Sequence, residues 1–173
     1  MKYLIILAGL ATTFAACKQS KEELIARRWQ AVALESPMMD EQIRMQREFL
    51  DTVGTSTDAA TNEVLYGVRN MDSMRQWMKT QFDSIILEQK SAIANTWLNF
   101  SKEGTVVSSF GSAPDTVSWY FDDEGALILD ELKHKGAGSK VKMEVVKLDE
   151  DSLKLRFNEN GFSSTAILIP AKD

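Results

Sequence analysis

Hydrophobic and polar positions along the chain fall into three successive patterns. In residues 25–35 they alternate with a period of two, which predicts a strand that carries Trp29 and Ala31 on one face. In residues 37–94 the apolar positions have helical spacing instead. Residues 96–170 return to short alternating segments separated by polar turns. The pattern therefore predicts one strand, then a helical block, then a series of strands.

The helical block is predicted to contain two or three helices. Ser36 before a proline is typical of a helix start, and this first helix is expected to run to about Thr52. A long helix capped by Asn70 or Asp72 is expected to continue to about Ala94. About 22 helical residues would measure about 33 Å, enough to cross a small domain. We therefore expect the block to lie across the mouth or the side of the strand domain.

Seven strands are predicted after the helical block, and their turns are marked by glycine and acidic residues. Asn160-Gly161 is a strong hairpin signal, and Asp122 to Gly125 forms another turn. With the first strand these make eight strands joined mostly by short connections. Such a series favours a mainly β fold, an eight-stranded antiparallel meander closed into a barrel, with the helices inserted between strands 1 and 2.

The first residues form a segment of a different kind. Lys2 supplies a short basic start, the apolar run after it is too short to span a bilayer, and small residues precede Cys17. These features are typical of a secretory signal peptide. The segment Phe14-Ala15-Ala16-Cys17 resembles the lipobox of bacterial lipoproteins, with phenylalanine in place of the usual leucine. An ordinary signal peptide followed by an incidental cysteine is the alternative.

The lipoprotein resemblance implies cleavage before Cys17 and acylation of its sulfur and its amine, as with palmitate. Several acyl chains give lasting membrane attachment, since each buried CH₂ contributes roughly 0.8 kcal/mol. Residues 1–16 would then be the signal peptide, residues 17–23 the lipidated cysteine and a tether, and residues 24–173 one domain. Lys18 stands where an inner-membrane retention signal has aspartate, so the resemblance implies attachment to the outer membrane, on its periplasmic or its surface face.

The short acidic segment Lys21-Glu22-Glu23 has two interpretations. It resembles the export tag of surface lipoproteins of Bacteroidota, or it is the polar start of the fold. Cleavage before the cysteine would remove one charged residue, Lys2, and leave 25 acidic and 19 basic residues, a net charge of −6. This charge argues against electrostatic binding of nucleic acid or of anionic lipid.

Residues that could carry catalysis or hold a metal are scarce in this sequence. Cys17 is the only cysteine, so the mature domain has no disulfide, thiol nucleophile or cysteine metal site. His134, the only histidine, lies between lysines in a predicted loop, and nothing around it suggests a catalytic triad. The acidic clusters at 122–124 and 149–151 lack the spacing of a calcium loop. We therefore expect no catalytic residue, no metal and no cofactor.

Four segments of the strand-rich part, in order, resemble the lipocalin-like lipoproteins of Bacteroidota. They are the tryptophan strand at Ile25–Ala33, the turn Phe100–Thr105, the Trp-Tyr-Phe strand at 119–121, and the hairpin at 145–155. The resemblance implies a calycin-type barrel, and such barrels host carriers, inhibitors and passive scaffolds alike. The chain departs from the family at Arg27, where glycine is usual, and in the length of its helical block.

The leading hypothesis for function is non-enzymatic binding of a small hydrophobic ligand by an envelope-anchored lipoprotein. Under it, Trp29, Trp97 and Trp119 lie near a barrel cavity, and a helix carrying Met74 and Met78 covers the opening. The alternative for these five side chains is that they fill the core, because an eight-stranded barrel is just wide enough for its own side chains.

The second hypothesis is a protein-interaction or structural module of the cell envelope. In this interpretation the exposed face of the helical block docks a partner through Arg44, Arg47, Arg75 and Lys79, which stand among acidic residues. A large exposed apolar patch on the helices would favour this hypothesis, whereas an internal cavity would favour ligand binding.

Overall fold

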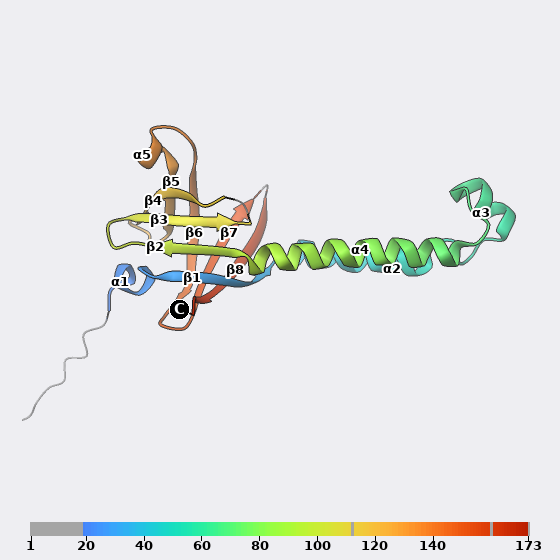
Figure 1. The fold of residues 1–173 in the computed structure, drawn as a ribbon, viewed down its shortest axis with the longest axis horizontal. Coiled ribbons are helices and arrows are strands. Elements are labelled where there is room, and N and C mark those ends of the chain that lie inside the picture. The colour runs from blue at the N-terminus through green and yellow to red at the C-terminus, as the bar shows by residue number, and fades with distance from the viewer. Residues whose placement is uncertain (1–18, 112, 160, 173) are drawn as a thin grey trace, which may run out of the picture.

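The computed structural model describes residues 19–111, 113–159 and 161–172. The predicted signal peptide and Cys17 lie outside the described residues, so the lipid anchor stays a prediction. The eight predicted strands and the long helices are present (Figure 1).

Eight antiparallel strands form a closed barrel in which each strand pairs with its neighbour in sequence and β8 pairs with β1. This confirms the predicted fold class. The strands are β1 Arg28–Glu35, β2 Thr96–Phe100, β3 Thr105–Phe110, β4 Asp115–Phe121, β5 Leu127–Asp130, β6 Lys140–Leu148, β7 Leu153–Glu159 and β8 Phe162–Pro170.

Five helices accompany the barrel in the described residues, and three of them connect β1 to β2, as predicted. The helices are α1 Lys21–Ile25, α2 Pro37–Thr52, α3 Ala59–Tyr66, α4 Met71–Ala94 and α5 Glu131–Lys135. Asn70 caps α4, since its side chain accepts a hydrogen bond from the Asp72 N–H at 2.9 Å. Ser36 precedes α2 as predicted, but its side chain makes no capping bond.

Strand alternation explains the barrel interior. Inward positions are mostly apolar on every strand, and neighbouring strands contribute side chains such as Leu98, Val106 and Leu155 to one core. The turn between β4 and β5 has local reasons to form. Asp122 accepts a hydrogen bond from the Ala126 N–H at 2.8 Å, and Gly125 takes a φ of +80°, which glycine tolerates without strain.

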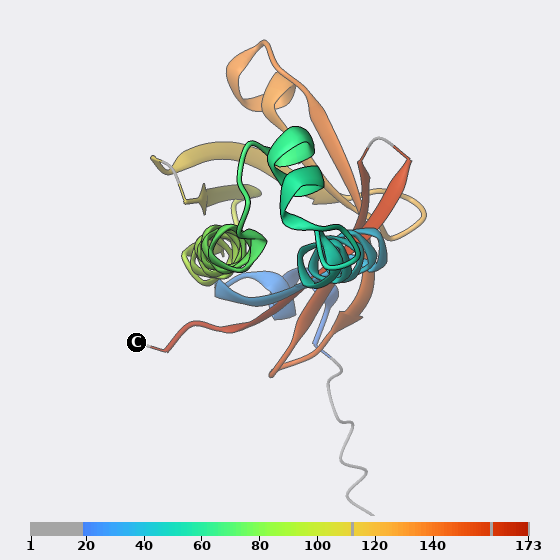
Figure 2. The ribbon, with the colours of Figure 1, turned by 90° about the vertical axis from the view of Figure 1, so that its right-hand side faces the viewer.

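The predicted position of the helical block is wrong. The helices α2 and α4 lie side by side and project away from the barrel as an arm with α3 at its tip (Figures 1 and 2). Only Ser36 separates β1 from α2, and only Asn95 separates α4 from β2. One residue leaves no room for the chain to reverse, so both helices continue outward from the ends of their strands.

The start of the domain also differs from the prediction. Residues 21–23 belong to helix α1 and not to a tether, and β1 begins at Arg28 and not at residue 25. A capping box stabilises α1, because Ser20 accepts from the Glu23 N–H while the Glu23 carboxylate accepts from the Ser20 N–H. Ile25, expected in the strand, is the fully buried end of this helix.

The strand order gives the barrel two distinct ends. The end with α1 and the turns at 101–104, 122–126 and 149–152 is called the closed end. The opposite end, where α2 and α4 leave and where α5 connects β5 to β6, is called the arm end. Within the described part of the chain, no helix is long and apolar enough to cross a membrane.

A candidate ligand cavity at the arm end of the barrel

Two tryptophans fill the closed end of the barrel. Trp29 is fully buried, and its Nε1–H donates to the Ile25 carbonyl of α1 at 2.9 Å. The Nε1–H of Trp119 donates to the Ser101 carbonyl at 3.0 Å, and its ring packs edge-on against Phe100, with ring centroids 5.5 Å apart. These bonds satisfy the indole donors inside the core and fix both rings across the barrel. Both rings belong to the buried core cluster of the barrel.

The arm end is hollow in contrast. A cavity of about 390 Å³ lies there, open to solvent on one side and lined mainly by apolar side chains. Alternation on β4 to β7 points these side chains inward, and they are smaller than the indoles of the closed end. The apolar lining residues are Phe110, Ala113, Val117, Leu129, Val141, Met143 and Phe157.

Four polar residues complete the lining: Ser108 on the inner wall, and Asp115, Glu131 and Ser139 at the rim. Ser108 lies between inward Val106 and Phe110 on β3 and is almost fully buried. It is therefore the polar side chain placed deepest among the lining residues. A hydroxyl in this position can donate or accept one hydrogen bond with a bound molecule.

Charges at the rim are paired with each other. Lys135 Nζ lies 2.5 Å from Asp115 Oδ2, and this contact, with the bond from the Thr116 N–H, lowers the pKa of the Asp115 carboxyl below 3.8. Glu131 Oε2 accepts a hydrogen bond from the Ser139 N–H at 2.9 Å. Both carboxylates are thus engaged by protein groups, and the opening presents little unpaired charge to a ligand.

Helix α5 is fixed on the rim by the buried carboxylate of Asp130. This side chain accepts from the Lys133 N–H at 2.8 Å and from the Tyr120 hydroxyl at 3.3 Å, and it lies 2.8 Å from Lys140 Nζ. The hydrogen bond from Lys140 is the main reason that the pKa of Asp130 lies below its ordinary value. Asp130 therefore holds the wall of the cavity without entering it.

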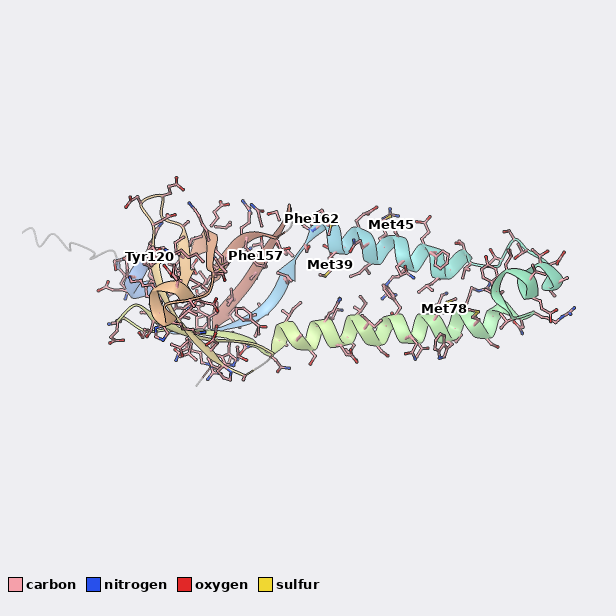
Figure 3. The ribbon with its side chains drawn as sticks, turned by 90° about the horizontal axis from the view of Figure 1, so that it is seen from above. Met39, Met45, Met78, Tyr120, Phe157 and Phe162 are labelled. Atoms are coloured by element: carbon pink, nitrogen blue, oxygen red, sulfur yellow. The ribbon has the colours of Figure 1, made fainter. Side chains whose placement is uncertain are left out.

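The five side chains that the sequence offered as ligand-binding residues do not line this cavity. Trp29 and Trp119 are in the packed closed end. Trp97 faces outward from β2, where the Arg28 guanidinium lies 4.3 Å from its ring centroid. Met74 and Met78 belong to α4 in the arm, and Met78 is visible far from the barrel in Figure 3.

Sequence reasoning found the strands that build the cavity but not the cavity itself. Val117, Leu129, Met143 and Phe157 stood out only as alternating strand positions, and Ser108 received no role. One usable signal was available. The two inward tryptophans, Trp29 and Trp119, lie near the closed end, whereas the largest side chains that line the arm end are phenylalanines. A change in side-chain volume along a barrel axis marks the end that stays open.

A second hollow of about 580 Å³ lies on the outer surface near the β4–β5 turn and is lined mainly by polar groups. Lys142 lies there within ion-pair distance of Asp122 and Glu124, and Arg156 pairs with Glu144. These pairs account for the charged character of the surface without any ligand. Among the described residues, no cluster of three His, Cys, Asp or Glu side chains could hold a metal ion. His134 lies in α5, not in the predicted loop.

Comparisons of the chain with protein-family models, curated proteins and solved structures gave no significant match. The resemblance to lipocalin-like lipoproteins of Bacteroidota therefore stays a prediction. The order of the strands and the geometry of the cavity carry the functional argument.

Proposed function

We propose that this protein is an envelope-anchored lipoprotein whose barrel binds a small hydrophobic ligand at its arm end, without catalysing a reaction. The observation that carries the proposal is the apolar cavity of about 390 Å³ in a barrel packed solid at its other end. Mouths of β-barrels are common ligand sites, and largely apolar walls with few polar groups are typical of them.

The size and polarity of the cavity restrict the class of ligand that it can bind. Ligand pockets usually measure about 300–1,000 Å³, so this cavity is at the lower end and suits a compact molecule better than a long lipid. Ser108 offers one neutral hydrogen-bonding group on the inner wall, while the rim carboxylates of Asp115 and Glu131 are already paired. The favoured ligand is a compact hydrophobe with one uncharged polar group.

The anchor and the cavity would lie at opposite ends of the domain. Three residues separate Cys17 from Lys21, the first residue of α1, and even fully extended they span about 10 Å. Helix α1 packs on the closed end, so a lipid on Cys17 would hold that end near the membrane and leave the cavity open away from it. Replacing Cys17 with serine should release the protein into the soluble fraction, and continued membrane association would exclude the anchor.

The test of ligand binding uses the chain from residue 18 to 173, which contains every described element. Native mass spectrometry of this chain, after it has been mixed with its own envelope extract and gently repurified, should show an added mass that is lost on denaturation. The neutral apolar fluorophore N-phenyl-1-naphthylamine serves as a probe in a second measurement. We expect its fluorescence to rise on binding and to saturate at one molecule per barrel.

Two matched variants locate the site. Val117→Phe adds volume to the inner wall of the cavity, whereas Val107→Phe makes the same change on the outer face of β3, opposite Thr116 of the neighbouring strand. We expect Val117→Phe to weaken probe binding at least about tenfold. A loss of about 1.4 kcal/mol in binding free energy corresponds to a tenfold rise in the Kd. Val107→Phe should bind like the parent chain. Equal binding by both variants, or none by the parent, would refute the proposed site.

A further inference from the structure

The arm has one face held together by ion pairs. Arg47 lies 2.8 Å from Asp83, and Lys79 lies 2.5 Å from Asp51, so two bridges join α2 to α4 on this side. Exposed pairs of this kind add little stability individually, but they fix the relative register of the two helices.

The cations proposed from the sequence as a docking surface are therefore already engaged within the arm. Arg44 contacts Glu41 and Glu48 on its own helix, and the largely buried Arg75 donates to the Val53 carbonyl at 2.9 Å. A partner that used these cations would first have to break these contacts. The charged face is thus a poor candidate for docking.

The opposite face of the arm is uncharged and apolar. Helical spacing places Gln42, Met45 and Phe49 of α2 on this side, together with Trp77, Gln81 and Ile85 of α4. The four large apolar side chains among them are each about half exposed or more. Figure 3 shows Met39 between the two helices, whereas Met45 points away from α4. The only charged side chain that the spacing puts on this face of the described arm is Glu88, near the barrel.

This face, called the uncharged face, has the size of a specific interface. Its length is about 24–36 Å from the helix lengths and its width about 20 Å, so two such faces would bury roughly 1,000–1,400 Å². Specific protein interfaces need about 1,000 Å² or more. Two helices alone bury few side chains completely, and four helices packed around a common core form a standard bundle.

We propose that two copies of this chain associate through their uncharged faces, with the arms antiparallel in a four-helix bundle. Identical faces that carry amides and apolar groups but almost no charge are self-complementary, as a two-fold interface requires. The barrel is wider than the arm on every side (Figure 2), so two barrels at the same end would collide before parallel arms could touch.

The antiparallel arrangement also covers the tip of the arm. Val64 and Leu65 of α3 are exposed, and so is Phe162 at the arm end of the barrel. With arms overlapping along their length, the α3 tip of one copy comes to lie beside the barrel rim of the other. The dimer thus gives partners to exposed apolar side chains at both ends of the arm.

The oligomeric state of residues 18–173, which include no Cys17 and hence no lipid, tests the proposal directly. Light scattering after size exclusion should give twice the mass of one chain at micromolar concentration. Ile85→Glu places a charge on the uncharged face, and Leu87→Glu places the same charge on the far side of the same helix. Each new carboxylate has one acidic neighbour, Glu88 or Asp83, and the one at position 87 also has Lys90 three residues on.

We expect Ile85→Glu to weaken dimerisation at least about tenfold, because a buried unpaired carboxylate is costly, and Leu87→Glu to leave it unchanged. Circular dichroism checks that both variants keep their helices. A parent chain that remains a monomer up to about 100 μM, far above the Kd of a specific dimer, would overturn the proposal. Equal effects of the two variants would also overturn it.

Disulfide cross-linking tests the orientation, since residues 18–173 contain no cysteine. A mixture of Leu65→Cys and Phe162→Cys chains should form the mixed disulfide-linked dimer. Leu65→Cys alone should not link to itself, because antiparallel arms hold the two tips far apart. Efficient self-linking of Leu65→Cys would show parallel arms and overturn the antiparallel dimer.

Discussion

Single residues have roles in this protein that depend on their place in the barrel and not on their type. Trp29 and Trp119 are buried with their indole N–H groups bonded to carbonyls, while Trp97 is outside the barrel under a guanidinium and Trp77 is exposed on the arm. Asp130 is a second example. It is one of several acidic residues at or just after the end of a strand, yet among those whose burial the structure describes it alone is buried, and it fixes α5 to the rim.

The buried carboxylate of Asp130 predicts a pH dependence of stability. Its pKa in the folded protein lies below the ordinary 3.8, mainly because Lys140 bonds to it. A lowered folded-state pKa gives a stabilising contribution that is fully present above the unfolded value and is lost as the pH falls through the folded value. Asp130→Asn should therefore be less stable than the parent at pH 7, and the difference should shrink below pH 3.8.

Urea unfolding of both chains between pH 2 and pH 7 measures this difference. Asp123→Asn, in the exposed β4–β5 turn, serves as the control and should track the parent. A difference between the Asp130→Asn chain and the parent that stays constant across the whole range would mean that the carboxylate does not act through its charge.

At the scale of elements, the junction between arm and barrel is the decisive feature. The side-chain amide of Gln30 on β1 donates to the carbonyls of Ala94 and Thr96 at 2.7 and 2.8 Å. Carbonyls in the last turn of a helix lack partners within it, so this amide caps α4 where it enters β2. The two one-residue connections and the two hydrogen bonds of Gln30 together hold the arm in its direction.

Removing the side-chain amide of Gln30 should weaken the junction between the arm and the barrel. Gln30→Ala leaves the carbonyls of Ala94 and Thr96 without this donor, and we expect a loss of about 1–2 kcal/mol in the free energy of unfolding. Hydrogen exchange should speed up in the last turn of α4 before it does so elsewhere in the arm. Gln76→Ala, an exposed glutamine near the tip, should change neither measurement. Unchanged exchange in Gln30→Ala would show that the connections alone hold the arm.

At the scale of the whole molecule, the barrel and the arm are separate packing units. The residues of the buried core come from α1 and the strands, and among the described hydrophobic residues of the arm only Ile93 packs against this core. The strands β1 and β2 pair directly, with Gln30 opposite Trp97, so the barrel is closed without help from the helices. Ligand binding and self-association are thus assigned to different parts of the chain.

Deleting the arm should separate these two properties. Replacement of residues 37–94 by a flexible linker of about six residues, which can span about 20 Å, should leave a folded barrel with strand-type circular dichroism. This chain should bind N-phenyl-1-naphthylamine as the full chain does and should be a monomer. A shortened chain that fails to fold would show that the barrel core needs the arm in order to fold. A folded one that still dimerises would place the interface on the barrel.

Local pattern was enough to predict the eight strands and the two long helices, but not the short helices α1 and α5. The alternation of Leu98 with Phe100 and of Val117 with Trp119 reports the strands, because side chains of a strand alternate between wet and buried faces whatever the rest of the fold. Asn160-Gly161 and Asp122 to Gly125 marked turns for a similarly local reason. Short connections then restricted the order of strands to a meander, and the closed barrel followed.

The sequence by itself determined the strands and the two long helices, and the tertiary structure decided where these elements point and which surfaces and cavities they leave open. The arm's direction depends on how two strand ends meet at Ser36 and Asn95, which no hydrophobic pattern records. The cavity depends on which inward side chains gather at one end of the barrel. The pairing of Arg47 with Asp83 joins two residues that are 36 positions apart in the sequence and belong to different helices. Periodicity reports the environment of a single element, whereas cavities, ion pairs and free surfaces arise only when distant elements are placed together.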